Sequence, residues 1–296
     1  MTSTLETQFE TALQDAAAAT DAVLERLLSQ SASPRLLRAM RYAALGAGKR
    51  LRPFLVIESA RLFNVPPPSA LRVGAALECV HCYSLVHDDL PAMDNDDLRR
   101  GKPTLHKKFG EATAILAGDA LLTLAFEILA GAETHPDAAV RSTLVLELAR
   151  ASGMNGMAGG QMLDIEAEND ASLSPDQIMR IQSHKTGALF RFACEAGAIL
   201  AGADRSPLCR YADDIGLAFQ ISDDLLDLYS TPQALGKATQ KDRGKGKATI
   251  ASLMGRDAAQ LKAQELVKSA IAALAPYGSA AETLRAAARF IILRKN

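Results

Sequence analysis

The sequence lacks tryptophan, is poor in aromatic residues and carries almost no net charge. Of its 296 residues only 5% are Phe, Trp or Tyr, and the formal net charge at pH 7 is −1. Without an excess of positive charge there is no overall field to draw nucleic acid or an anionic membrane toward the protein. We therefore expect no nucleic-acid partner, and we expect local groups of basic residues to meet a small anion.

Long apolar runs and an N-terminal basic segment are also missing. No uninterrupted apolar run reaches the roughly 18 residues of a membrane span. Residues 1–25 hold five acidic residues and no Lys or Arg. Signal and transit peptides carry positive charge in this region, so the sequence predicts a cytoplasmic protein without a membrane span.

Cysteine is scarce, with four residues in the chain. Cys79 and Cys82 form a C-x-x-C pair, but the pair lacks the βαβ context of a redox motif and the further ligands of a zinc site. We therefore expect neither redox nor zinc chemistry, and we interpret the two thiols as small buried side chains of a helix.

Helical signals extend along nearly the whole sequence. Alanine and leucine are abundant, and apolar residues recur at steps of three and four, the spacing of an amphipathic helix. Proline and glycine mark the breaks, and Ser174-Pro175-Asp176-Gln177 is typical of a helix start with a capping box. We expect an all-α fold in a single domain, residues 1–296. Helices are predicted over residues 3–30, 35–47, 53–63, 69–91, 111–131, 137–152, 155–168, 175–202, 207–229, 257–275 and 280–293.

Two short acidic clusters interrupt the apolar helical stretches. They consist of Asp88, Asp89 and Asp94, and of Asp223, Asp224 and Asp227. Aspartate is a poor helix former and resists burial, so each cluster needs a compensating partner. Mg²⁺ suits this need, because it takes oxygen ligands from one or two carboxylates and fills its remaining positions with water and substrate phosphate. Two clusters that face each other would therefore hold a diphosphate through magnesium ions.

Helical geometry indicates how each cluster presents its carboxylates. Asp223 and Asp227 are four residues apart, so they share one helix face at a separation of about 6 Å along the axis. Asp94 follows Asp88 by six residues, and Pro91 between them should end the helix and turn Asp94 back toward Asp88. An acidic helix end without a ligand is the weaker interpretation of the first cluster, since carboxylates at a helix C-terminus oppose the helix dipole.

Basic residues gather near these clusters. Arginine matches phosphate oxygens with two donors and lysine acts as a point charge, so groups of the two suit a phosphate ligand. Lys185 lies in an apolar helical stretch, where its burial is costly unless it meets an anion. Each basic group alone is explained as well by a solvated turn, and for residues 235–249 a solvated loop and a mobile flap both stay open. The groups are Lys49, Arg50 and Arg52; Arg99 and Arg100; and five Lys and Arg residues between 235 and 249.

The order of these motifs resembles that of the trans-isoprenyl diphosphate synthases along nearly the whole chain. The acidic clusters match the two aspartate-rich motifs of that family, the first in a longer form with two extra residues before Asp94. The segment 82–94 is most similar to the bacterial farnesyl diphosphate synthase group. The departures are Asn95, where many relatives carry Asp, and Ala248, where Ser or Thr is common. The other matching motifs are Gly48-Lys49-Arg50, Arg99-Arg100, Gly160-Gln161, Lys185-Thr186, Phe219-Gln220, Leu235-Gly236-Lys237 and Gly246-Lys247.

The resemblance implies a fold, a reaction and an assembly. The implied fold is an isoprenoid-synthase-like helical bundle around a central cavity, assembled as a homodimer. The implied activity is that of a magnesium-dependent prenyltransferase, which condenses isopentenyl diphosphate with dimethylallyl or geranyl diphosphate to make (2E,6E)-farnesyl diphosphate. Three Mg²⁺ ions would bridge to the allylic diphosphate. The released diphosphate would take the final proton, so the protein would need no base of its own.

The resemblance also assigns roles to individual residues. The magnesium ligands and the residues assisting them would be Asp88, Asp89, Asp94, Asp223, Asp224 and Asp227. The allylic diphosphate and the cation formed from it would meet Arg99, Lys185, Thr186, Gln220, Lys237 and Lys247. The isopentenyl diphosphate would be bound without metal by Gly48, Lys49, Arg52, His81 and Arg100. Catalysis would depend on Asp88, Asp89, Asp94, Arg99, Lys185, Thr186, Gln220, Asp223 and Lys237. The length of the product would be limited by Tyr83 and Ser84.

Three alternatives stay open. A geranylgeranyl diphosphate synthase would share the same chemistry, although an aromatic side chain at Tyr83 favours the shorter C15 product. A class I terpene cyclase shares the first acidic motif, but it usually carries an Asn/Ser/Glu motif at the second and needs no isopentenyl diphosphate cluster. An inactive regulatory subunit of a prenyltransferase complex tends to lose the second acidic motif, which this sequence keeps.

Overall fold

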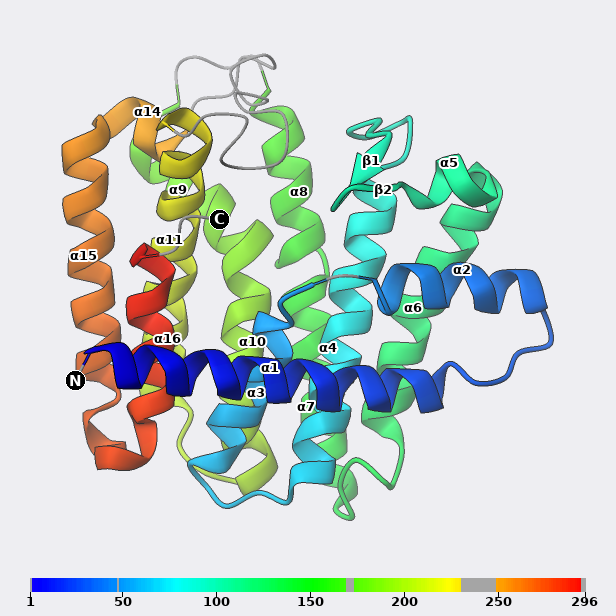
Figure 1. Cartoon of the computed structure of the whole chain (residues 1–296), viewed down its shortest axis with the longest axis horizontal. Coiled ribbons are helices and arrows are strands. Elements are labelled where there is room, and N and C mark those ends of the chain that lie inside the picture. The colour runs from blue at the N-terminus through cyan, green and yellow to red at the C-terminus, as the bar shows by residue number, and fades with distance from the viewer. Residues whose placement is uncertain (1, 47, 169–172, 230–248, 294–296) are drawn as a thin grey trace.

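The computed structural model describes residues 2–46, 48–168, 173–229 and 249–293, which are almost entirely helical (Figure 1). The prediction of an all-α fold is confirmed. The elements in chain order are α1 (Thr2–Leu27), α2 (Pro34–Ala44), α3 (Leu51–Arg61), α4 (Pro67–Asp88), β1 (Leu98–Arg99), β2 (Lys102–Pro103), α5 (Leu105–Phe109), α6 (Glu111–Ala130), α7 (Ala138–Ser152), α8 (Met157–Glu166), α9 (Pro175–Gln182), the π-helical η1 (Ser183–Gly187), α10 (Ala188–Ala201), α11 (Ser206–Tyr229), α14 (Ile250–Met254), α15 (Arg256–Ala273), the 3₁₀-helical η2 (Ala275–Ala281) and α16 (Glu282–Leu293).

Most predicted helices are present with ends shifted by a few residues, but the single helix predicted over 175–202 is wrong. That stretch forms α9, the π-helical segment η1 and α10. The predicted capping box at its start is confirmed, since Ser174 and Gln177 bond to each other's backbone N–H groups. The short helices α5 and α14 and the β1–β2 pairing were not predicted, because elements of five residues or fewer are too short to show a periodic pattern.

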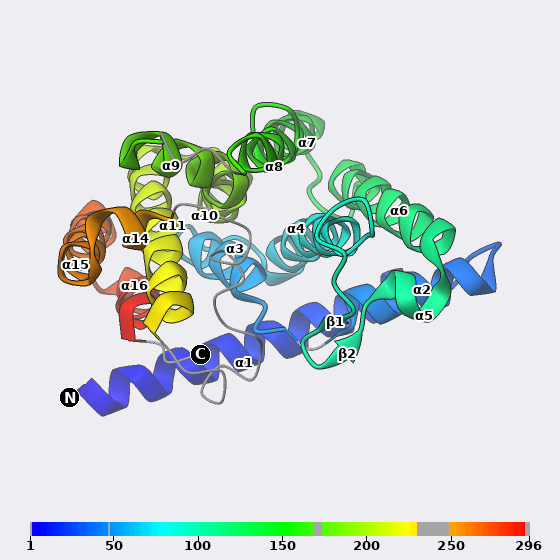
Figure 2. The same cartoon turned by 90° about the horizontal axis from the view of Figure 1, so that it is seen from above.

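The innermost helices are α3, α4 and α10 (Figure 2). All residues from 73 to 80 on α4 and from 192 to 200 on α10 are buried. A helix that is buried around its circumference must be surrounded by other helices, and Figure 1 shows α1 crossing in front of this group. Gly197 permits the close approach of α10 to α3, because a Cβ atom there would lie 2.3 Å from the backbone of Ser59 and Ala60.

Helix α6 has the length and apolar composition to cross a membrane, and it is the one such helix among the described residues. The expectation based on uninterrupted apolar runs missed it because Asp119 and Glu127 break the run. A core helix passes the same test, and the buried side of α6, which includes Leu121 and Ala125, packs against α4. The opposite side exposes Ile115 and Leu116.

The four cysteines are free thiols. Cys79 and Cys82 are buried on α4, as predicted. Burial raises the pKa of Cys79 to about 12 and that of Cys82 well above its usual value. Both thiols are therefore protonated near neutral pH, and Cys82 donates a hydrogen bond to Glu78.

Candidate active site

The first acidic cluster lies where α4 ends. The helix stops at Asp88, and the chain turns through Pro91 so that the Asp94 N–H donates to the Asp88 carbonyl at 2.8 Å. The prediction that Pro91 turns Asp94 back toward Asp88 is confirmed. The proline is compatible with this turn because it cannot continue the helical hydrogen-bond pattern.

The carboxylate of Asp88 lies among other charged groups. Burial, together with the nearby carboxylates of Asp94 and Asp89, raises its pKa to about 6, although Lys185 and Arg99 oppose the rise. Crowded, partly buried carboxylates favour a hard cation, which removes their mutual repulsion. The donor set at Asp88 and Asp94 therefore fits Mg²⁺, which is bound through oxygen.

Asp89 holds Arg99 in place. It is 3% exposed and both of its carboxylate oxygens accept hydrogen bonds from Arg99, at 2.6 to 2.9 Å. Burial raises the pKa of Asp89, and the bonded guanidinium opposes this. This two-pronged geometry fixes the Arg99 side chain next to the end of α4, which is the place predicted for a phosphate-binding arginine.

The π-helical segment η1 carries Lys185 and Thr186. Its Lys185 Nζ donates to Asp164 of α8 at 2.6 Å. Gly160 allows α8 to pack closely against η1, because a Cβ atom at this position would lie 2.2 Å from the backbone nitrogen of Lys185. Such π-helical turns occur often at functional sites, where they redirect a few side chains out of the regular helical pattern. Sequence reasoning missed Asp164; its only signal was an aspartate inside an apolar helical stretch.

The second acidic cluster lies on α11. Asp223 lines a cavity together with Thr186 and Gln220. Asp224 is 5% exposed and turns the other way: one oxygen accepts from the Gln220 amide at 2.9 Å, and the other from the Ile250 N–H at 3.0 Å. Asp224 thus links α11 to the first turn of α14. Asp227, one turn further along α11, is half-buried.

The cavity at Asp223 has a volume of about 580 Å³ and brings the predicted diphosphate-binding residues together. Arg52 stacks over the Phe190 ring, 5.0 Å from its centroid, and its buried Nε has no hydrogen-bond partner. Burial lowers the pKa of His81, and the positive charges of Arg52 and Arg100 lower it further, so His81 is a neutral donor. All five residues predicted to bind isopentenyl diphosphate line this cavity: Gly48, Lys49, Arg52, His81 and Arg100.

Gly48 lies close to the end of the Arg100 side chain. A Cβ atom at this position would lie 2.5 Å from a guanidinium nitrogen of Arg100. The loop before α3 therefore passes directly beside Arg100. The adjacent Arg50 also lines the cavity, but it is 3% exposed and its guanidinium bonds to Glu78 and Asp21.

The two residues predicted to limit product length lie on α4 before the first acidic cluster. Tyr83 is half-buried, and its ring packs edge-on against His87, with the centroids 5.7 Å apart. His87 Nε2 lies 3.1 Å from the Ile115 carbonyl oxygen of α6. Burial raises the pKa of Tyr83, and the charge of Asp88 adds to this. The Ser84 hydroxyl donates to the His81 carbonyl.

The described ranges contain no group of three or more His, Cys, Asp or Glu side chains close enough to hold a metal ion by themselves. Binding through the acidic clusters therefore needs oxygen atoms from water or a ligand as well, which is the usual way Mg²⁺ is held. Lys237, Lys247 and the rest of residues 235–248, for which a solvated loop and a mobile flap were both left open, lie outside the described residues.

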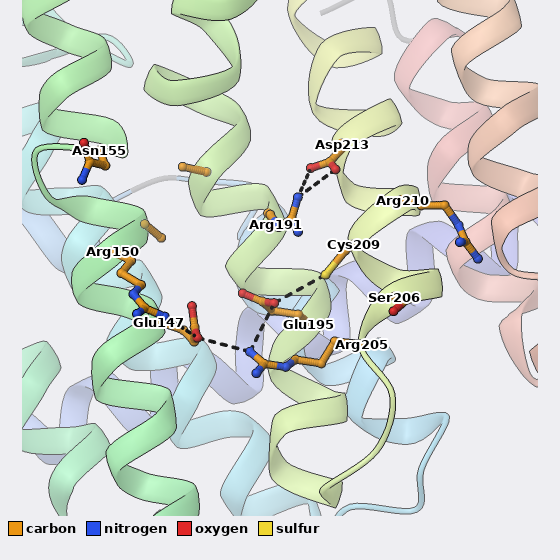
Figure 3. Close-up of a pocket in the computed structure, with 12 residues that line it drawn as sticks. Glu147, Arg150, Asn155, Arg191, Glu195, Arg205, Ser206, Cys209, Arg210 and Asp213 are labelled. Carbon is orange, nitrogen blue, oxygen red and sulfur yellow. Dashed lines mark hydrogen bonds and ion pairs between the residues drawn. The ribbon is translucent and has the colours of Figure 1, made fainter.

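A second cavity, of about 590 Å³, lies between α7, α10 and α11 (Figure 3). Arg191 of α10 makes two hydrogen bonds to Asp213 of α11, at 2.9 and 3.1 Å. Arg205, in the loop before α11, pairs with Glu147 of α7 at 3.4 Å and Glu195 of α10 at 3.7 Å. These charges join neighbouring helices to one another.

Sequence and structure comparisons find close relatives over most of the chain. The polyprenyl synthetase family profile matches residues 33–284. The chain is 48% identical over 269 residues to a farnesyl diphosphate synthase of Escherichia coli (strain K12), covering 88% of this chain and 89% of that protein. It is 43% identical over 260 residues to a geranylgeranyl diphosphate synthase of Cyanophora paradoxa, covering 87% of each. The solved structure of an FPP/GFPP synthase from Zymomonas mobilis aligns with a TM-score of 0.88 at 49% identity, covering 96% of this chain and 99% of that one.

Proposed function

The chain belongs to the polyprenyl synthetase family and is a prenyltransferase, and on this premise we propose that it joins isopentenyl diphosphate to dimethylallyl or geranyl diphosphate. The proposed product is (2E,6E)-farnesyl diphosphate. The observation that carries the proposal is the cavity of about 580 Å³, in which Lys49, Arg52 and Arg100 meet Asp223 of the second acidic cluster. Such a site can bind two diphosphates side by side. One would be bound by the basic side chains and the other through metal ions held by carboxylates.

The acidic clusters would bind the allylic diphosphate. Three Mg²⁺ ions would be held by Asp88, Asp94 and Asp223. Asp89, Asp224 and Asp227 would assist these ligands. Bound Mg²⁺ supplies positive charge that stabilises the departing diphosphate. Asp89 and Asp224 assist by orientation, because the first fixes Arg99 and the second fixes Gln220.

The residues around the clusters add fixed charge to the same leaving group. Lys185, oriented by Asp164, and Arg99, oriented by Asp89, are held beside Asp88 before any substrate arrives. Charges that are already in place require no reorganisation when the allylic C–O bond ionises. Lys237 and Lys247 are proposed to contribute further cations. Thr186 and the carbonyl oxygen of Gln220 would offer their dipoles to the allylic cation.

The other half of the cavity would bind isopentenyl diphosphate without metal. Lys49, Arg52 and Arg100 supply positive charge, and neutral His81 supplies a hydrogen-bond donor. Gly48 keeps the loop backbone next to Arg100. The new C–C bond forms between the terminal alkene carbon and the allylic cation, and the released diphosphate takes the proton that is then lost.

Incubation with labelled isopentenyl diphosphate and either allylic diphosphate, with and without Mg²⁺, tests this function. Chromatography of the dephosphorylated products should show a linear C15 alcohol that requires Mg²⁺. A linear C20 alcohol would indicate a geranylgeranyl diphosphate synthase, a cyclic hydrocarbon a terpene cyclase, and absence of turnover an inactive subunit. Tyr83→Ala should lengthen the product because the ring stands one turn before Asp88; unchanged C15 output would remove Tyr83 as the stop.

A cytoplasmic homodimer completes the proposal. The exposed apolar side chains Ile115 and Leu116 on α6, at 44% and 58% exposure, favour association with a second copy. Light scattering of the purified protein should give twice the mass of one chain, and the mass of a monomer at working concentrations would contradict the dimer.

A further inference from the structure

Arg50 belongs to the lining of the cavity at Asp223 and is 3% exposed. Its guanidinium donates to Glu78 of α4 at 2.6 Å, to Asp21 of α1 at 2.9 Å, and to the carbonyl oxygens of Ala44 and Gly46 at 2.6 and 3.1 Å. Its backbone adopts a left-handed conformation with φ of 50°, which is uncommon for a residue other than glycine. The side chain is thus held inward by four acceptors on three elements of the fold.

Glu78 is the important partner in this set. It is 2% exposed, so its carboxylate cannot be satisfied by bulk water, whereas the side chain of Asp21 is 43% exposed. Glu78 also lines the same cavity as Arg52. A buried carboxylate that loses its partner is costly and turns to the nearest available cation.

Arg52 is a cation that lines the same cavity as Glu78 and whose pKa is affected by the Glu78 charge. Burial lowers the pKa of Arg52, and Glu78 is the charged neighbour that opposes this most strongly, ahead of Asp223. Within the described part of the chain Arg52 makes no ion pair, and its buried Nε has no acceptor. Because Glu78 and Arg52 line the same cavity, a Glu78 carboxylate without its Arg50 partner is placed to compete for the Arg52 guanidinium.

We propose that Arg50 is a positioning residue that occupies the Glu78 carboxylate and so keeps Arg52 available for a metal-free diphosphate. The identity of that diphosphate as isopentenyl diphosphate rests on the function proposed above. The opposing view is that Arg50 only supports the loop before α3. The two views differ in one expected result. If Arg50 acts through Glu78, removing the charge of Glu78 restores the diphosphate binding that is lost when Arg50 is replaced.

Calorimetric titration with inorganic diphosphate in EDTA measures this without turnover. Arg50→Met should weaken diphosphate binding by about tenfold, because Arg52 becomes paired with Glu78. Arg50→Met combined with Glu78→Gln should recover most of this loss. Equal weakness of the single and double variants, or a single variant that binds like the wild type, would overturn the proposal.

A second variant covers the case in which Arg50→Met does not fold. Glu78→Gln alone should bind diphosphate at least as tightly as the wild type, since the competing carboxylate is gone; weaker binding would overturn the proposal. Arg205→Met and Arg205→Met/Glu195→Gln are matched controls, because they remove a similar pair in the second cavity. Both should change the melting temperature and leave diphosphate binding unaltered.

Kinetics separates the role of Arg50 from the proposed reaction. Arg50→Met should raise KM for isopentenyl diphosphate and leave KM for the allylic diphosphate unchanged, a split that general loss of stability would not produce. An inactive wild type with the expected pattern of diphosphate binding would refute the proposed reaction and keep the role of Arg50. An active wild type without this pattern of diphosphate binding would support the proposed reaction and refute the role of Arg50.

Discussion

Two cavities in the described part of this protein have nearly the same volume, about 580 and 590 Å³, and both are lined by arginines and carboxylates. In the cavity between α7, α10 and α11, Arg191 and Arg205 pair with acidic residues on neighbouring helices. In the cavity at Asp223, the inward-facing Arg50 takes the buried carboxylate, and Arg52 stacks on Phe190 without an ion pair. Between these two cavities the difference therefore lies in the pairing of the arginines rather than in the number of charges: Arg191 and Arg205 form ion pairs across helices, and Arg52 does not within the described residues.

The physical reason is the cost of removing a charge from its partner. An arginine that has to give up its carboxylate partner in order to bind a substrate anion has only a small net gain. An arginine held by stacking alone can form new charge-assisted hydrogen bonds without such a loss. We therefore expect the cavity between α7, α10 and α11 to join helices and the cavity at Asp223 to bind a ligand.

The largest expected effect is a difference in kcat between substitutions of two aspartates on α11. Asp223→Asn should reduce kcat by about 10² to 10³-fold, the size of effect seen when a group that stabilises transition-state charge is removed. Asp213→Asn, ten residues earlier on α11, should leave kcat close to that of the wild type because Asp213 serves only its pair with Arg191. Steady-state kinetics at saturating substrate measures both, and equal losses would abolish the distinction between the cavities.

A smaller effect is expected for the arginines. Arg52→Met should raise KM for isopentenyl diphosphate by about tenfold to a hundredfold, because hydrogen bonds to charged groups contribute about 1.5–3 kcal/mol. Arg191→Met removes an exposed ion pair, which contributes about 0–1 kcal/mol to stability. It should lower the melting temperature slightly and leave KM unchanged. A comparable change in KM for Arg191→Met would show that the second cavity takes part in binding.

The smallest effect concerns the pH dependence of stability in the second cavity. Burial raises the pKa of Glu195, while Arg205 opposes the rise. The unfolded chain loses this proton at lower pH than the folded protein, so folding is favoured below the ordinary glutamate pKa and stability falls as pH rises through the raised pKa. Glu195→Gln removes this dependence.

Melting curves at several pH values test the role of Glu195. The melting temperature of Glu195→Gln relative to the wild type should increase as the pH rises above the ordinary glutamate pKa of about 4.3. A difference that stays constant with pH would show that Glu195 does not titrate in this window. Turnover of the variant should match that of the wild type at each pH, since Glu195 lies in the second cavity.

The helices and the turn at the first acidic cluster were predictable because both depend on nearby residues. The spacing of apolar residues located all long helices except where η1 interrupts the stretch 175–202. Pro91 alone was enough to predict that Asp94 returns to Asp88. Each of these features is set by residues within a few positions of one another.

The partners of the charged side chains were not predictable in the same way. Nothing local indicated that Lys185 meets Asp164, that Asp224 reaches the first turn of α14, or that Arg50 turns inward to Glu78. The π-helical turn at Lys185 was also missed, since it depends on the close approach of α8 at Gly160.

The sequence alone established which residue types stand on which helix face, and from their spacing it indicated a helical protein with two carboxylate clusters for magnesium and diphosphate. The packing of distant helices decided which of those charges are already satisfied and which face a cavity. The reason is that an ion pair forms only over a few ångströms, and those separations are set by helices far apart in the chain. Arg50 and Arg52 are two residues apart in sequence, yet Arg50 pairs with Glu78 and Arg52 stacks on Phe190.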